Sequence, residues 1–330
     1  MELITNTNPI EMIQDVSQIV QGTPTPSKFI EANTTAVSLD HIKRDCIIPV
    51  FAKDNETTIS HYDFINATHE VATSLFSTSI NTPNIRVSHQ IKGRVPSAIN
   101  KPARELLEHE KTIYYERMAF MFEIPNKQIV VNNQVLNLTI GGVRAYNQEN
   151  LYSKKTIEKF KVFIGFKNTV CTNLCISTDG LKSEIRVSGI SELQQTIYEL
   201  VTNYNQEAHL GNMERMHKFS LNEFEFAHLV GKMKLYHFLR KSNKKDKFPI
   251  QLTDSQITSV VKGYYKDPNF RCSENNDLNL WNLYNLFTEA NKSSYIDSNL
   301  ERNVNTYEFV QNIGNSLQNK SANWYLQHIL

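Results

Sequence analysis

The period of the hydrophobic pattern changes near residue 190, and this change constrains the fold more than any other feature of the sequence. Before it, apolar and polar residues alternate, as in the segment 158–168 (EKFKVFIGFKN), which is typical of a strand. After Ser191, apolar residues recur every three or four positions, which is the spacing of amphipathic helices. The sequence therefore predicts an α+β fold: an antiparallel, twisted sheet with flanking helices, followed by an all-helical C-terminal part.

Composition and periodicity together divide the chain into three parts. Residues 1–40 mix Asn, Thr, Ser and Pro with little periodic hydrophobicity, so we expect a flexible leader with one short helix at Glu11–Val20. Residues 41–190 carry the alternating segments and form the predicted antiparallel α+β domain. Residues 191–330 carry the amphipathic segments and form the predicted helical domain.

Turn residues and capping boxes locate elements within these parts. Asn132 and Asn133 separate two apolar runs and tolerate positive φ, which predicts a tight hairpin. A turn between two strands is expected at Asp54–Asn55. Capping boxes predict helix starts at Ser60 with Asp63, Ser191 with Gln194, Ser220 with Glu223, and Thr253 with Gln256. The expected core includes Phe120, Phe122, Ile164 and Phe166 of the sheet and Leu229, Leu235, Trp281, Leu283, Tyr284 and Phe287 of the helices.

The stretch 166–181 (FKNTVCTNLCISTDGL) raises the question of a metal or redox site, because Cys171 and Cys175 are four positions apart. If residues 169–177 form a strand, the two Cα atoms lie about 13 Å apart at ~3.3 Å per residue. That distance is too long for a disulfide or for one tetrahedral ion. We therefore expect reduced cysteines that fill the core, in a cytoplasmic protein with neither metal nor cofactor.

Charge and motifs exclude several classes of function. The formal net charge is +1, so nucleic acid would have to bind to a local patch rather than to the field of the whole molecule. The sequence contains no window of ~18 uninterrupted apolar residues, so no membrane span is expected. Glycine-rich phosphate loops, nucleophile elbows and zinc motifs are missing from it, which disfavours an enzyme.

Basic residues gather in the loop 86–104 and in the strand 159–167, where Lys and Arg could follow a phosphate backbone while bases stack on aromatic rings. The residues expected to contact nucleic acid are Arg86, His89, Lys92, Arg94, Lys159, Lys161, Phe163 and Lys167, with Tyr146 as a further candidate for stacking. A second cluster, 232–247, holds seven Lys and Arg residues. Cations at a helix C-terminus complement its dipole, and we favour that interpretation for it.

Residues 45 to about 190 resemble a Bacteroidetes family known as domain of unknown function 3871. The segments that carry the resemblance include IRVSHQIKGRVPSAINKPARELLEHEKTIYYERMAFMFEIP, IGGVRAYN and FIGFKNTVCTNLCISTDGL. The segments VCTNLC and LWNLYNLFTEA are also similar to a wider phage- and plasmid-like family, although Leu174 stands where that family has glycine. The resemblance implies a link with mobile genetic elements and provides no catalytic residue.

The leading functional hypothesis is a mobile-element protein that binds single-stranded or duplex nucleic acid during replication, recombination or transfer. One alternative is a protein-interaction module that acts against a host complex, or on another mobile-element protein, through the helical part. Another is a metal-assisted hydrolase around His61, Asp63, His89 or His109. We favour a capping or solvated role for His61 and Asp63, and a position at a surface helix end explains His109 at least as well. The oligomeric state stays open.

Overall fold

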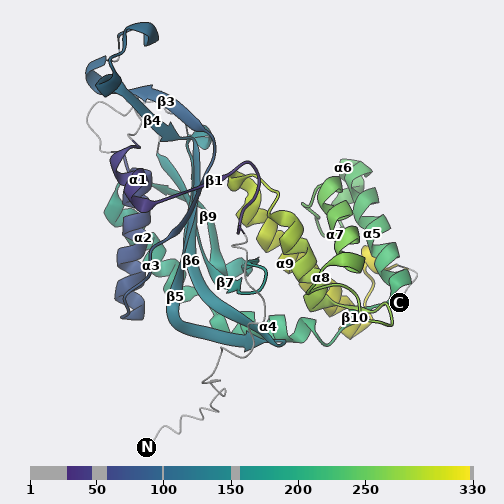
Figure 1. Ribbon diagram of the computed structural model, residues 1–330. Coiled ribbons are helices and arrows are strands. Elements are labelled where there is room, and N and C mark those ends of the chain that lie inside the picture. The colour runs from purple at the N-terminus through teal and green to yellow at the C-terminus, as the bar shows by residue number, and fades with distance from the viewer. Residues whose placement is uncertain (1–27, 47–57, 99, 150–156, 328–330) are drawn as a thin grey trace, which may run out of the picture.

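A computed structural model of the chain describes residues 28–46, 58–98, 100–149 and 157–327 (Figure 1). Within these residues, seven strands form one antiparallel sheet in the order β1-β2-β5-β6-β7, and β8 and β9 both pair with β7. The strands are β1 (Thr35–Val37), β2 (Asn84–Val87), β5 (Arg117–Val131), β6 (Gln134–Ala145), β7 (Glu158–Asn168), β8 (Leu174–Cys175) and β9 (Leu181–Val187). The predicted α+β class and antiparallel sheet are confirmed.

Helices follow the sheet, as the change of period predicts, and several also flank it. They are α1 (Leu39–Arg44), α2 (His61–Phe76), α3 (Ile190–Asn203), α4 (Gln206–Met216), α5 (Glu223–Phe238), α6 (Lys241–Lys244), α7 (Asp254–Lys266), α8 (Leu280–Asn291) and α9 (Ile296–Asn319). Two small ribbons lie apart from the main sheet: β3 (Gln90–Arg94) with β4 (Lys111–Tyr115), and β10 (Ser220–Leu221) with β11 (Leu278–Asn279). No helix in the described ranges is long and apolar enough to cross a membrane.

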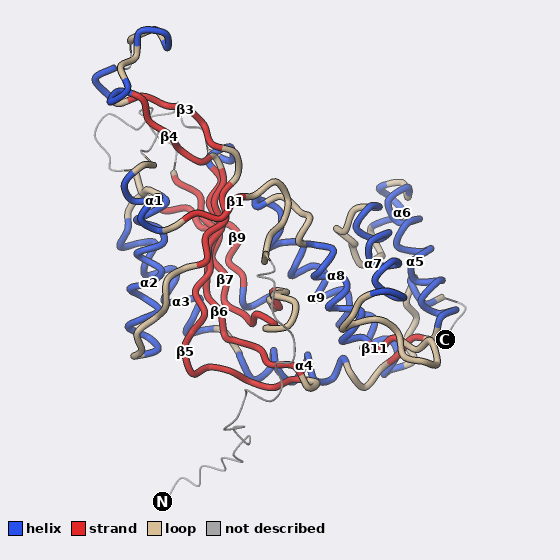
Figure 2. Tube along the Cα trace, in the orientation of Figure 1, coloured by secondary structure: helices blue, strands red, loops and turns tan. Residues whose placement is uncertain are grey.

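The main sheet is covered on both faces (Figure 2). On one face α2 and α3 pack against it, and the ring of Phe64 in α2 lies 5.0 Å from that of Phe120 in β5. On the other face Ile296 and Leu300 of α9 pack against Phe163 and its apolar neighbours. The alternation predicted for the strands is therefore present, but the face of β7 that carries Lys161 and Phe163, which were expected to contact nucleic acid, lies beneath α9.

The β5–β6 hairpin confirms the turn predicted at Asn132 and Asn133. Val131 pairs with Gln134, so the loop has two residues, and their φ angles are 50° and 61°. Two residues with positive φ make the turn whose twist matches that of the flanking strands. This hairpin fixes the register of the two longest strands.

Several local predictions are wrong. Residues 169–173 form a turn in place of a strand, with Thr172 at φ 57°, and β8 contains two residues. The box expected at Ser191 is not formed because α3 begins one residue earlier, after Gly189. Ser220 lies in β10, and the box of α5 is built two residues later by Asn222 and Glu225. The boxes of α2 and α7 are confirmed.

Part of the predicted leader belongs to the sheet. Residues 28–40 include β1, which pairs with β2, and the first residues of α1. The helix expected at Glu11–Val20 and the turn expected at Asp54–Asn55 lie outside the described residues. A single buried cluster runs through both the sheet and the helical part, so apolar packing continues across residue 190. The predicted core is confirmed except for Leu235, which is exposed.

Candidate nucleic-acid interface

The lysines of β7 lie on the sheet face that α9 covers. Lys161 donates to the main-chain oxygen of Asp297 and forms an ion pair with Glu301, both in α9. Lys167 forms an ion pair with Glu123 of β5. Because each of these two cations already has an acidic partner inside the fold, it contributes little positive potential to the surface.

The aromatic residues expected to stack on bases are buried. Phe163 is 1% exposed and packs beneath α9. Tyr146 is also buried, and its ring lies 4.6 Å from the guanidinium group of Arg144. Burial next to Glu149 and Glu158 raises the pKa of Tyr146 to about 12, although Arg144 opposes this shift. Neither ring can reach a base in this conformation.

Arg86 acts inside the protein. Its side chain is buried between β1 and β5, and it donates to the main-chain and hydroxyl oxygens of Thr34. Thr34 immediately precedes β1, so this contact holds the edge strand on the sheet. The structure therefore gives Arg86 a role in holding β1 on the sheet, and the sequence pattern did not predict this role.

Lys159 lines a cleft of 350 Å³ along β7. Lys161 and Arg186 also line the cleft, together with the carboxylates of Glu184 and Glu301. Positive and negative groups alternate along its walls, and an anion entering the cleft would meet both. The carboxylates therefore make this cleft a weaker phosphate-binding site than a surface that carries only Lys and Arg would be.

Among the residues expected to contact nucleic acid, Lys92 and Arg94 lie on the ribbon β3–β4, away from the sheet face that α9 covers. Figure 1 shows the ribbon leading away from the main sheet, with short 3₁₀ turns at its far end. Lys92 is exposed. Arg94 is half-buried and donates to the main-chain oxygen of Lys101, and it lies directly opposite Lys111 in the register of the two strands. His89 is exposed at the base of the ribbon. Residues 90–94 were expected as a loop, so the sequence pattern missed the strand that positions these charges.

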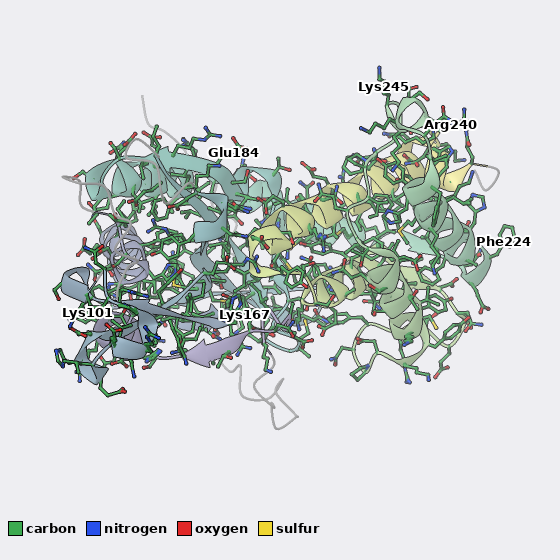
Figure 3. The ribbon with its side chains drawn as sticks, turned by 90° about the horizontal axis from the view of Figure 1, so that it is seen from above. Lys101, Lys167, Glu184, Phe224, Arg240 and Lys245 are labelled. Atoms are coloured by element: carbon green, nitrogen blue, oxygen red, sulfur yellow. The ribbon has the colours of Figure 1, made fainter. Side chains whose placement is uncertain are left out.

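Acidic residues at the far end of the ribbon neutralise some of its charge. Lys101 pairs with Glu110, and Lys111 pairs with Glu108, whose side chain is 90% exposed. Exposed ion pairs contribute little and are screened by salt. In Figure 3 this end, marked by Lys101, lies far from Lys167. The predicted residues are thus divided among the ribbon, the sheet under α9 and the β1 edge, and the fold does not bring them together.

The second basic cluster packs largely against the protein itself. Lys232 and Lys247 lie over the ring of Trp324, at 4.8 and 5.5 Å from its centroid. Lys234 forms an ion pair with Asp254. Arg240 and Lys245, which immediately precede and follow α6, are exposed and project outward (Figure 3).

The residues of the hydrolase alternative are separated. His61 is buried, its Nε2 lies 2.8 Å from the main-chain oxygen of Tyr115, and burial and the charge of Arg144 lower its pKa to about 3. Asp63 accepts hydrogen bonds from Ser60 in the capping box. Within the described ranges no group of three His, Cys, Asp or Glu residues is arranged to hold a metal ion.

An ionic cluster that sequence reasoning missed surrounds Arg144 of β6. Its guanidinium group lies 3.1 Å from Glu158 and 3.3 Å from Glu149, and it also donates to the main-chain oxygen of Ile59. Glu158 in turn accepts from the N–H of Ile59 at 3.1 Å. In the sequence, the only sign of this cluster is a single arginine within the apolar segment IGGVRAYN.

A second missed contact joins the two segments VCTNLC and LWNLYNLFTEA. Asn173 donates to the main-chain oxygen of Asn285 at 3.0 Å, and Lys292 donates to the main-chain oxygen of Cys171. The turn after β7 is therefore fixed on α8 by buried polar groups. Nothing in the spacing of the two segments, about 110 residues apart, predicts their contact.

Comparison with known proteins gives one positive result. A family model described as "Domain of unknown function, B. Theta Gene description" matches residues 12–326. No curated protein and no solved structure matches the chain. Because the match extends over nearly the whole sequence, the chain belongs to this family of unknown function, DUF3871.

Proposed function

We propose that the protein binds nucleic acid through the ribbon β3–β4 during replication, recombination or transfer of a mobile element. One observation carries the proposal: Lys92, Arg94 and Lys111 share one side of a two-stranded ribbon that extends from the body of the sheet. Residues two apart on a strand, and residues directly opposite on its partner, lie on the same face. A cationic face of this shape can follow a phosphate backbone.

The pairing of Arg94 with Lys111 is unfavourable for the isolated protein. Like charges directly opposite each other destabilise an antiparallel pair, and the exposed Glu108 offsets this repulsion weakly. A phosphate placed between the two cations would remove the repulsion. The charge arrangement of the ribbon therefore favours an anionic ligand.

Duplex DNA suits the ribbon better than a single strand. The major groove of B-DNA admits a two-stranded ribbon, and lysine and arginine contacts to phosphate position it there. Binding of single strands depends on exposed aromatic rings, whereas Tyr146 and Phe163 are both buried. We accordingly expect a duplex to bind more tightly than a single strand of the same length.

Fluorescence anisotropy with a labelled duplex at several salt concentrations tests the proposal. The affinity is expected to fall steeply as salt rises, because bound phosphates release counterions. The triple variant Lys92→Ala/Arg94→Ala/Lys111→Ala should lower the slope of log affinity against log salt by about 2 to 3 in magnitude.

A matched triple variant separates the position of the charges from their number. Lys218, Lys262 and Lys266 are exposed on the helical part, and replacing all three with alanine removes the same net charge. This variant should bind the duplex like the wild type. Equal losses in the two triple variants, or binding that does not respond to salt, would reject the ribbon as the contact surface.

A protein-interaction module is the second candidate, and a specific observation favours it. The helical part exposes large apolar side chains on α5, where Phe224 is 72% and Phe238 is 84% exposed. Exposed apolar side chains gathered on one element are typical of protein interfaces. This candidate and the nucleic-acid proposal concern different surfaces of the molecule.

A further inference from the structure

The outer face of α5 is an apolar stripe with no partner among the described residues. Phe224, Ala227, Gly231, Leu235 and Phe238 are all exposed, and their spacing along the sequence places them on one side of the helix. The opposite side is buried against α7 and the segment 324–326. A helix that is apolar on both sides is typical of a buried helix, so α5 carries more apolar surface than the monomer uses.

The stripe is symmetric about Gly231. Phe224 and Phe238 lie seven residues before and after it, and Ala227 and Leu235 lie four residues before and after it. If two copies of α5 cross antiparallel at Gly231, each Phe224 meets the Phe238 of the other copy and each Ala227 meets a Leu235. Phenylalanine side chains then meet at the ends, each Ala227 leaves room for a Leu235 between the ends and the centre, and the two Gly231 residues lie at the centre, where the helices approach most closely.

Gly231 has no role within the monomer that the described structure explains. A Cβ added at this position would meet no atom within 4 Å, and its φ angle is not in the positive region. Glycine in a helix interior is unfavourable relative to alanine. A close approach by another helix at this position accounts for a glycine that intrachain packing does not require.

Charge along α5 also matches an antiparallel copy. Glu223 and Glu225 lie in the first turn of the helix, and Arg240 and Lys241 follow its C-terminal end. Antiparallel packing places the acidic end of each copy at the level of the basic end of the other. Parallel packing would instead place like charges together.

We propose that α5 is a homodimer interface, in which two copies of the chain pack antiparallel about a twofold axis at Gly231. Figure 3 shows Phe224 projecting outward at the end of the molecule farthest from the sheet. The ribbon β3–β4 lies at the other end of the molecule. The dimer would therefore leave both ribbons exposed, and its existence does not depend on nucleic-acid binding.

Sedimentation velocity over a range of protein concentrations tests the dimer. The wild type is expected to reach twice the mass of the 38.1 kDa chain. Gly231→Leu should reduce this to the monomer mass, because its side chain fills the space at the twofold axis. Gly211→Leu is the matched control, since a Cβ at Gly211 in α4 also meets no atom within 4 Å, and it should leave the mass unchanged.

Cysteine crosslinking with a short bismaleimide reports the arrangement of the two helices. Gly231→Cys should crosslink to itself, in excess over the wild-type background from the four native cysteines. Phe224→Cys should not, because the same residue in the antiparallel copy lies about 21 Å away along the axis. A mixture of Phe224→Cys and Phe238→Cys chains should crosslink.

Three outcomes would overturn the proposal. If the wild type stays monomeric at every concentration, the apolar stripe does not bind a second copy. A different protein would then be its partner, as the interaction-module candidate requires. Self-crosslinking of Phe224→Cys would indicate a parallel dimer. A dimer mass that Gly231→Leu does not change would place the interface on another surface.

Discussion

Two buried histidines show how single side chains make the stability of this fold depend on pH. His61 lies 4.7 Å from the ring of Tyr146, and His209 lies among the rings of Phe166, Tyr204 and Tyr307. Burial is the main cause that lowers the pKa of each histidine to about 3. Both are therefore neutral in the folded protein at every pH at which it is expected to work.

These pKa values predict a loss of stability in weak acid. The unfolded chain binds a proton at each histidine near pH 6.5, whereas the folded chain does so near pH 3, so the free energy of unfolding falls as the pH falls between these values. Between pH 7 and pH 5 each histidine should contribute a loss of about 2 kcal/mol. Urea unfolding of His61→Gln and His209→Gln at both pH values checks this. Each variant should lose less stability than the wild type, and unchanged losses in both would contradict the assignment.

The cluster around Arg144 predicts a large effect from one substitution. Arg144→Met leaves the carboxylates of Glu149 and Glu158 buried without their cation, and removing one partner of a buried pair costs about 3–5 kcal/mol. Arg144→Lys keeps the charge but cannot reach all three acceptors, so an intermediate loss is expected. Chemical denaturation measures both. A loss below about 1 kcal/mol in the methionine variant would mean that the cluster adds nothing to stability.

Single residues were predictable where burial alone decided their role. Cys171 and Cys175 are buried thiols that form no disulfide, as expected, and burial raises the pKa of Cys171 to about 12, which makes its thiol unreactive. Phe163 and Lys161 were assigned to the correct face of their strand but to the wrong environment. Strand alternation gives the side on which a residue lies, and it does not say what covers that side.

The β5–β6 hairpin is the element whose sequence and geometry agree most closely. Asn133 sits at φ 61°, a region where glycine is unstrained and β-branched residues are strongly disfavoured. The side chain of Asn132 donates to the main-chain oxygen of Met213 in α4, so the turn also contacts the helical part. The hairpin therefore helps to fix both the sheet and its connection to α4.

Substitutions at Asn133 should separate backbone preference from side-chain contacts. Asn133→Gly is expected to keep or slightly raise the free energy of unfolding, and Asn133→Val should lower it by about 1–2 kcal/mol. Both replacements remove the same asparagine side chain, so their difference reports the turn conformation. Thermal unfolding of the two variants measures it, and equal melting temperatures would contradict a positive-φ turn.

Elements fixed by local chemistry were predictable, and elements fixed by distant contacts were not. The boxes at Ser60 and Thr253 use neighbouring residues alone, and the positive φ of the turn at Asn132 and Asn133 depends on the tolerance of asparagine itself for that conformation. The turn 169–173 is held by local hydrogen bonds to Asn168 and by contacts with Asn285 and Lys292, which are more than 100 residues away, whereas its β-branched composition indicated a strand. These hydrogen bonds outweighed local propensity there.

At the scale of the whole molecule, the sequence predicted the fold class but not the surface that the fold presents. The basic residues of β7 were expected to face solvent and contact nucleic acid because they alternate with the apolar residues of the same strand. In the structure α9 covers that face, and Glu301 pairs with Lys161. An amphipathic pattern shows that α9 buries one side, and it does not identify the sheet face that receives it.

The long sequence separation between β7 and α9 has a consequence for synthesis on the ribosome. Phe163 and Leu174 are shielded by Ile296 and Leu300, so more than 100 residues must be made before their cover exists. During translation the nascent sheet carries a bare hydrophobic surface that a chaperone could hold. Completion of the native state must therefore wait until α9 (Ile296–Asn319) has left the exit tunnel.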